Sequence, residues 1–274
     1  MTEKEINELT KEWEALLATF YIQGYRIFNK ALIESIKPVL NAIEQSGSVV
    51  FASSLTNQLV TPIPIATAME SFINKISDRT ARHLFRQYLK FLPKETNVGV
   101  GFGNMQFRMA MQEYIRTSGS QHVQNITETT RKLVNKAFLD SAEAGETQKQ
   151  LAKRMLRYVN GGLDSNINKR ARALMIARTE TLMATARAKE AQLDLYEGVQ
   201  FEKVWIHSRG VKEPRIDHTA VNQTRRDKDG FWVLGGVNMR YAGDPNGGAD
   251  NNVNCRCSTV YVPKTDAEGN VLRN

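Results

Sequence analysis

The residues of this chain best suited to chemistry are one histidine and two cysteines in its C-terminal part. His218, Cys255 and Cys257 offer an imidazole nitrogen and two sulfurs, which are ligands that zinc prefers in proteins. Asp244 or His207 could add a further ligand. Cys-x-Cys is less typical of structural zinc than Cys-x-x-Cys, and no second paired motif follows. Buried thiols beside a hydrogen-bonded histidine are therefore the alternative interpretation.

The same residue types could also build a hydrolase or a metal-dependent nuclease. A cysteine nucleophile needs a base within reach, and the sequence does not place His218 beside either sulfur. Paired carboxylates with nuclease spacing are absent, and the glycines from Gly99 to Gly103 lack the Gly-x-Gly-x-x-Gly spacing of a phosphate-binding loop. We therefore expect no catalytic residues and no cofactor, with zinc as the one candidate.

Length and composition describe a folded protein. The chain has 274 residues, of which 41% are hydrophobic and 24% charged, so it can form two units with separate cores. It has no run of 18 apolar residues, and the N-terminal segment from Met1 to Glu5 is charged. These features predict neither membrane insertion nor secretion. Two cysteines one residue apart build no disulfide framework, which is typical of synthesis in a reducing cytosol.

The charge balance is basic, with a formal net charge of +8 and a pI of about 9.4. A basic surface attracts polyanions such as nucleic acid or an acidic protein surface. Lys and Arg along the helices could bind DNA without reading its sequence, and such binding would weaken with salt. The alternative is a solvated surface with surplus positive charge.

The first 145 residues are predicted to be mostly helical. Apolar residues follow a helical stripe from 3 to 37, and Pro38 is expected to end or kink that helix. Residues 47–64 mix β-branched residues with Ser, Thr and prolines, which favours a loop or a short extended segment. Further helices are predicted at 65–91, 105–118, 121–143 and 147–159, with turns at 99–104, 145–147 and 160–162.

A long helix over 166–196 is predicted to follow. Its narrow seam of small and apolar residues would let a partner element approach closely: Leu174, Ala177, Thr181, Ala184, Ala188, Ala191 and Leu195. Arg178, Glu180 and Arg187 flank this seam, where they either anchor neighbouring loops or remain solvated.

Beyond Gly198 the pattern changes to short extended segments. Residues 199–208 and 257–263 are predicted strands, separated by turns at 227–230, 235–236 and 243–248. The fold class is therefore α+β, with a mostly helical N-terminal region, a long helix and a small loop-rich α+β C-terminal domain. We place the domain boundary between residues 145 and 146.

Five short motifs occur in order through the second domain. They are Arg178-Thr179-Glu180, Lys203-x-Trp205, His218, Gly243-Asp244-Pro245 and Asn254-Cys255-Arg256-Cys257. Together they resemble the phage Mu F-like head-morphogenesis family of minor head proteins, over about residues 147–262. One departure lies at 208–215, where family members often carry Asp-x-Arg-x-Arg, although Arg215 keeps a basic residue three positions before His218.

The resemblance implies a minor structural protein inside the head of a tailed bacteriophage. It implies few copies, association with the portal protein and other head proteins, and assembly in the host cytoplasm. The basic charge fits contact with packaged DNA through the surface of the protein. Residues 1–145 match no known pattern, and a portal-docking or scaffold arm is a hypothesis for them. We also expect Asn254 and Arg256 to hold the loop from Gly243 to Asn252, with both cysteines facing the core.

Overall fold

The computed structural model describes residues 3–46, 49–88, 100–161, 171–196, 198–208 and 213–273. Several sequence predictions lie outside these ranges: the helix end near Leu92, the turn residues Gly99 and Gly162, the helix start at 166–170, and part of the variable segment 208–215. None of the described helices has an apolar stretch long enough to cross a bilayer.

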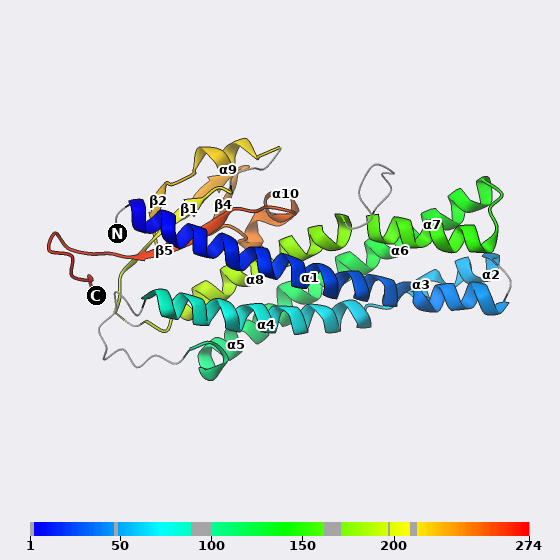
Figure 1. Cartoon of the computed structure of the whole chain (residues 1–274), viewed down its shortest axis with the longest axis horizontal. Helices are drawn as coiled ribbons and strands as arrows, with labels where there is room; N and C mark the ends of the chain where they lie inside the picture. The colour runs from blue at the N-terminus through cyan, green and yellow to red at the C-terminus, as the bar shows by residue number, and fades with distance from the viewer. Residues whose placement is uncertain are drawn as a thin grey trace. The chain divides into compact units, whose positions relative to one another are not determined.

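The chain divides into two compact units, each built from separate stretches of sequence. The first unit comprises residues 1–20, 73–114 and 178–274, and the second comprises residues 21–72 and 115–177. Three helices, α1 (Glu3–Ser46), α4 (Ile63–Tyr88) and α8 (Ala171–Leu193), contribute residues to both units (Figure 1). The domain boundary between residues 145 and 146 stays a prediction.

The second unit is helical. Besides its parts of α1, α4 and α8, it contains α2 (Val49–Ser54), α3 (Thr56–Leu59), a π-helical turn (Ile115–Gly119), α6 (Ser120–Glu143) and α7 (Gln148–Gly161). Helices α6 and α7 lie against each other. The buried Arg172 of α8 donates to Val159 O, which is near the end of α7, at 3.1 Å and to Ile126 O on α6 at 3.0 Å. Its guanidinium therefore joins three helices, and burial lowers its pKa to about 10.

Two predictions for the N-terminal region need correction. Of the end or kink expected at Pro38, the end is wrong, because α1 continues to Ser46 and its apolar stripe remains buried at Ile36, Val39 and Ile43. Burial of that stripe outweighs the single backbone hydrogen bond that proline removes. Residues 47–64, where described, mostly form α2, α3 and the start of α4, and the stretch 60–62, with an extended Val60, is not helical. Their β-branched residues lower helix propensity only slightly, and tertiary packing overrides it.

The first unit combines helices with a small antiparallel sheet. Besides its parts of α1, α4 and α8, it contains a 3-10 turn (Gly101–Gly103), α5 (Met105–Tyr114), α9 (Ile216–Ala220), a second 3-10 turn (Pro245–Gly247) and α10 (Gly248–Asn252). Strands β1 (Phe201–Ile206) and β5 (Ser258–Pro263) pair over their whole length, and β2 (Arg225–Asp227) pairs with the other edge of β1. Both strands predicted from the sequence are confirmed, and the observed fold is α+β.

A separate hairpin joins β3 (Trp232–Leu234) to β4 (Val237–Met239). Its two turn residues, Gly235 and Gly236, both have positive φ angles, of 57° and 77°. That combination suits a two-residue hairpin turn and is available to glycine at little cost.

Helix α8 is buried more completely than a single seam would require. From Glu180 to Leu193 every residue except Arg187 is buried. One side of the helix faces β5, where Lys189 donates to Thr259 O at 2.9 Å and Glu190 accepts a hydrogen bond from Tyr261. The predicted close packing against the sheet is confirmed, but the prediction of one narrow seam was wrong because neighbours surround the helix.

Candidate metal centre

The histidine and the two cysteines selected from the sequence meet in the first unit. His218 lies on α9, and Cys255 and Cys257 lie on the segment that leads into β5. The Nδ1 atom of His218 is 3.6 Å from the sulfur of Cys255 and 3.6 Å from the sulfur of Cys257. All three side chains are buried, and both cysteines belong to an apolar cluster with Trp205 and Trp232. The prediction that the cysteines face the core is confirmed.

The hydrogen bonds of Asn251 define the protonation of His218. The Nδ2 atom of Asn251 donates to Gly247 O at 3.1 Å, which leaves its Oδ1 atom facing His218 Nε2 at 3.0 Å. An oxygen can only accept, so Nε2 carries a proton and donates it to Asn251. The other ring nitrogen, Nδ1, then faces the two sulfurs, and it either offers them its lone pair or shares a proton with one of them.

Electrostatics couples the three groups. Burial disfavours the charged imidazole of His218, but hydrogen bonds with Cys255 and Asn251 outweigh burial and raise its pKa. Contact with Cys257, supported by His218, lowers the pKa of Cys255, whereas contact with Cys255 and burial raise the pKa of Cys257. Without a metal, the pair therefore favours one thiolate and one thiol.

Trp205 covers the imidazole. Its ring meets that of His218 edge to face, with centroids 5.3 Å apart and planes at 87°. The indole Nε1 is buried and makes no hydrogen bond with a residue in the described part of the chain, yet it lies close enough to Cys257 to favour the thiolate. The indole N–H therefore favours the thiolate of Cys257 without forming a hydrogen bond to its sulfur.

A cavity of about 330 Å³ adjoins the cluster. Its lining includes His218, Cys255 and Cys257, together with His207, Glu213 and Arg256. His207 therefore shares the cavity but lies outside the group of three potential ligand atoms, which are all within 4.8 Å of one another. Asp244 is not part of that group either, because its carboxylate accepts from the backbone N–H groups of Arg240 and Asn246 at 2.8 and 3.0 Å.

The Arg-Thr-Glu motif of α8 anchors the turn that precedes Cys255. Asn254 has a positive φ of 55°, its backbone N–H donates to Thr179 Oγ1 at 3.0 Å, and Arg178 Nη1 donates to its side-chain oxygen at 3.3 Å. The expectation that Asn254 holds the loop at 243–252 was wrong: Asn254 contacts α8. Glu180, the third member of the motif, is buried in α8.

Two residues outside the predicted set hold that loop. Arg215 donates to Asp250 O at 2.6 Å and to Val253 O at 3.0 Å, and Asn252 donates to Asp244 O at 2.7 Å. The sequence offered one signal for Arg215, the basic residue kept before His218. No sequence feature marked Asn251 or Asn252 as a site residue, because asparagine is common in loops and the partners of these two residues are distant in sequence.

The remaining motif residues shape the surroundings of the cluster. Lys203 is buried on β1, donates to Lys228 O at 2.6 Å, and has its pKa lowered to about 8 by burial. Gly243 has a φ of 90°, and a Cβ there would lie 2.9 Å from Leu182 Cγ on α8. Asp244 caps the turn that begins at Pro245. Each of these residues therefore contacts the backbone or a neighbouring helix.

The arrangement can in principle do two kinds of chemistry. Its sulfur and nitrogen atoms can ligate a metal ion, and its Cys-His-Asn order is also that of a thiol nucleophile with its base and orienting group. The sulfurs of Cys255 and Cys257 belong to side chains that are each only 4% exposed. A nucleophile must reach its substrate, so burial at this level favours the ligand role.

Comparison with known proteins identifies the domain to which the cluster belongs. Residues 132–260 match the family model described as Phage Mu protein F like protein. Neither a curated protein nor a solved structure gives a significant match. The matched range starts within α6, ends within β5, and includes all five motifs. Residues 132–260 of the chain are therefore similar to the phage Mu protein F-like family, and this similarity supports a structural protein of phage head morphogenesis.

Proposed function

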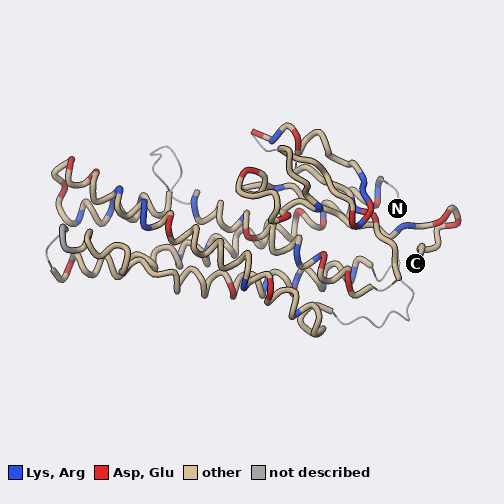
Figure 2. The backbone as a smooth tube through the Cα atoms, turned by 180° about the vertical axis from the view of Figure 1, so that it is seen from behind, with Lys and Arg blue, Asp and Glu red and all other residues tan. Residues whose placement is uncertain are grey.

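We propose that this protein is a minor head protein that lies inside the capsid, near the portal, and contacts the packaged DNA. The family match over residues 132–260 carries the proposal, because it supports a structural role in the phage head. The net charge of +8 suits a neighbour as negatively charged as DNA. Lys and Arg recur along the helices as well as near the strands (Figure 2).

Helix α7 presents the clearest candidate surface for DNA phosphates. Lys149, Lys153 and Arg157 are all exposed and are spaced four residues apart, so they share one face of the helix. At 1.5 Å per residue, neighbouring positions in this row are about 6 Å apart along the axis. Within the described ranges none of the three forms a salt bridge, and the guanidinium of Arg157 lies over the ring of Tyr158, 5.5 Å from its centroid. We call these three residues the α7 basic row.

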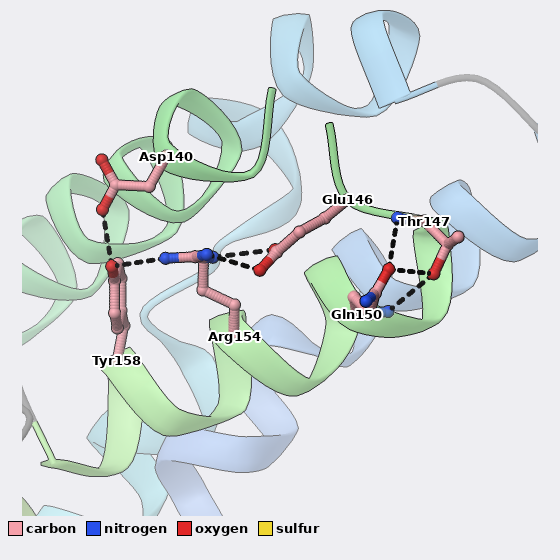
Figure 3. Close-up of polar contacts among 6 residues, drawn as sticks. All are labelled: Asp140, Glu146, Thr147, Gln150, Arg154 and Tyr158. Atoms are coloured by element: carbon pink, nitrogen blue, oxygen red, sulfur yellow. Dashed lines mark hydrogen bonds and ion pairs between the residues drawn. The ribbon is translucent and has the colours of Figure 1, made fainter. Parts of the chain in front are cut away.

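The rest of α7 is neutralised and held in place by its own contacts (Figure 3). Arg154 pairs with Glu146 at an Nε–Oε2 distance of 2.8 Å and donates to the hydroxyl of Tyr158 at 3.0 Å. That hydroxyl donates to Asp140 on α6 at 2.5 Å. Glu146 and Asp140 are therefore bound by Arg154 and Tyr158, and the charge of Arg157 also acts on Glu146.

The start of α7 is fixed by a reciprocal cap. The backbone N–H of Thr147 donates to Gln150 Oε1 at 2.8 Å, and the N–H of Gln150 lies 3.4 Å from Thr147 Oγ1. This is a capping box, which satisfies backbone donors at a helix start. A hollow of about 680 Å³ adjoins the helix and is lined in part by Lys153 and Arg157. The α7 basic row is thus displayed on a well-fixed helix beside a concave surface.

DNA binding is tested by measuring the affinity for a short duplex at several salt concentrations. Replacing all three residues of the α7 basic row with Gln should reduce the slope of log K against log salt by about 2.7, because each phosphate that a side chain neutralises adds about 0.9 to that slope. A matched control replaces the exposed Lys4, Lys11 and Lys75 with Gln, which removes the same charge from other helices. An equal fall of the slope in both triple variants, or no fall in the variant of the α7 basic row, would contradict DNA binding by this row.

Portal association is tested by cross-linking mass spectrometry on DNA-filled particles. We expect cross-links between lysines of residues 1–145 and the portal protein, because we assign portal docking to this helical region. Particles that lack the portal protein should lose these cross-links and should incorporate less of the chain. Cross-links to the major capsid protein alone would contradict a position near the portal.

A further inference from the structure

We propose that His218, Cys255 and Cys257 bind one zinc ion, with a water molecule from the adjoining cavity as the fourth ligand. The proposal concerns the internal structure of the domain and does not depend on portal or DNA contact. It rests on four observations: the distances among the three ligand atoms, the hydrogen bond that orients the imidazole, the N–H groups around the sulfurs, and the cavity.

The two nitrogen–sulfur distances match tetrahedral coordination. Zinc lies about 2.3 Å from a thiolate sulfur and about 2.0–2.1 Å from an imidazole nitrogen, so a tetrahedral angle places nitrogen and sulfur about 3.6 Å apart. His218 Nδ1 is 3.6 Å from each sulfur. Both nitrogen–sulfur distances therefore suit a common ion, and the two sulfurs lie within 4.8 Å of each other.

The imidazole is oriented as a metal ligand needs. A ligating histidine normally donates its other N–H to a neighbouring oxygen, which fixes both the tautomer and the ring. His218 does so through Nε2 to Asn251, and Asn251 is itself held by Gly247 O. The free lone pair of Nδ1 is thereby directed at the space between the sulfurs.

The sulfurs are surrounded by N–H donors that suit thiolates. The backbone N–H of Cys257 favours the thiolate of Cys255 and lowers its pKa, and the backbone N–H of Ser208 favours the thiolate of Cys257. The buried indole N–H of Trp205, which has no partner among the described residues, also lies near Cys257. A thiolate bound to zinc would accept from each of these donors and would satisfy the indole.

The fourth position faces the cavity beside the cluster. No fourth His, Cys, Asp or Glu in the described ranges joins the group of three ligand atoms. The cavity of about 330 Å³ has room for water, since a water molecule occupies about 30 Å³ in the liquid. Binding of the ion would expel the proton of the remaining thiol, and any proton on His218 Nδ1, into solvent, so the affinity should rise with pH.

Cobalt binding to the reduced, metal-free chain tests the site with a spectroscopic signal. We expect one Co²⁺ per chain, a thiolate-to-cobalt charge-transfer band, the intense visible absorption of tetrahedral Co²⁺, and loss of both on adding Zn²⁺. His218→Ala, Cys255→Ser and Cys257→Ser should each abolish the charge-transfer band or weaken binding by at least about tenfold, and Asn251→Ala should weaken it by about 10–100-fold. His207→Ala is the matched control, and it should bind as the unmodified chain does.

A second measurement on the unmodified chain covers variants that fail to fold. Bound Zn²⁺ should raise the Tm and should protect both thiols from alkylation. The proposal is overturned if the unmodified chain binds no stoichiometric Zn²⁺ or Co²⁺, or if the metal leaves thiol alkylation unchanged. It is also overturned if His207→Ala abolishes binding as His218→Ala does. Rapid alkylation of one thiol whether or not Zn²⁺ is present would instead support the thiol-nucleophile interpretation.

Discussion

The α7 basic row and the His218 cluster place functional side chains in opposite settings. The basic row consists of three exposed residues on one helix, and their common face follows from a spacing of four. The cluster gathers buried side chains from β1, α9, α10 and the segment before β5. Exposed charges can be removed one by one with separate effects on binding, whereas each buried group supports the others. Substitutions in the two regions should therefore change different measured quantities.

The largest effect expected on stability is that of Trp205→Ala. Trp205 is fully buried, packs on His218 and Trp232, and would leave a cavity, so the free energy of unfolding should fall by about 3–5 kcal/mol. Urea unfolding measures this change. The control is Phe231→Ala, at a side chain that is 49% exposed, and its free energy of unfolding should fall much less. Equal losses in the two variants would break the contrast between buried and exposed positions.

A smaller loss is expected for Gly243→Ala. The new Cβ would lie 2.9 Å from Leu182 Cγ, and the φ of 90° is strained for any side chain. Together these effects should cost about 1–3 kcal/mol in the same unfolding measurement. Gly103→Ala provides the control, because its Cβ would meet no atom within 4 Å. A neutral Gly243→Ala would show that α8 and the loop do not need their close approach.

The pH dependence of stability should carry a contribution from Lys189. Burial lowers its pKa from 10.5 to about 7, so between these pH values the unfolded chain binds more protons than the folded chain. Stability should therefore rise with pH across this window, by at most about 1.4 kcal/mol per pH unit, while below pH 7 the full cost of the buried charge is present. Lys189→Met should flatten the rise between pH 7 and 10, measured by urea unfolding. An unchanged slope would exclude this contribution.

The smallest effect on stability is expected for the α7 basic row. The triple replacement Lys149→Gln, Lys153→Gln and Arg157→Gln removes exposed charges without leaving a cavity, so the free energy of unfolding should change by no more than about 0.5 kcal/mol per position. The loss of DNA affinity at low salt would then be a binding effect. If the free energy of unfolding of the triple variant fell by several kcal/mol, the α7 basic row would be needed for stability and would not differ from the His218 cluster in this respect.

The sequence predicted those features whose signals are local. The strands at 201–206 and 258–263 follow from β-branched and aromatic residues, and the helices follow from apolar periodicity over many turns. The prediction that the first helix ends at Pro38 failed. Whether a helix continues through a proline depends on burial of the surrounding apolar stripe, and that burial depends on the rest of the fold.

The candidate site was predictable by residue type but not by geometry. Histidine and two cysteines indicated zinc ligands, yet their mutual distances depend on how α9 packs beside the segment before β5. Asn251, which orients the histidine, carried no signal because its partner lies 33 residues away in sequence. Asn254 was assigned to the wrong neighbour because spacing along the chain cannot distinguish α8 from the adjacent loop.

The central claim, that this chain is a structural protein of the phage head, is tested most directly by quantitative mass spectrometry of purified, DNA-filled particles of the phage that encodes it. The account predicts that the chain is present in every preparation, in few copies relative to the major capsid protein, and that it remains after the particles are washed in high salt. Particles that contain capsid and portal proteins but lack this chain would contradict it.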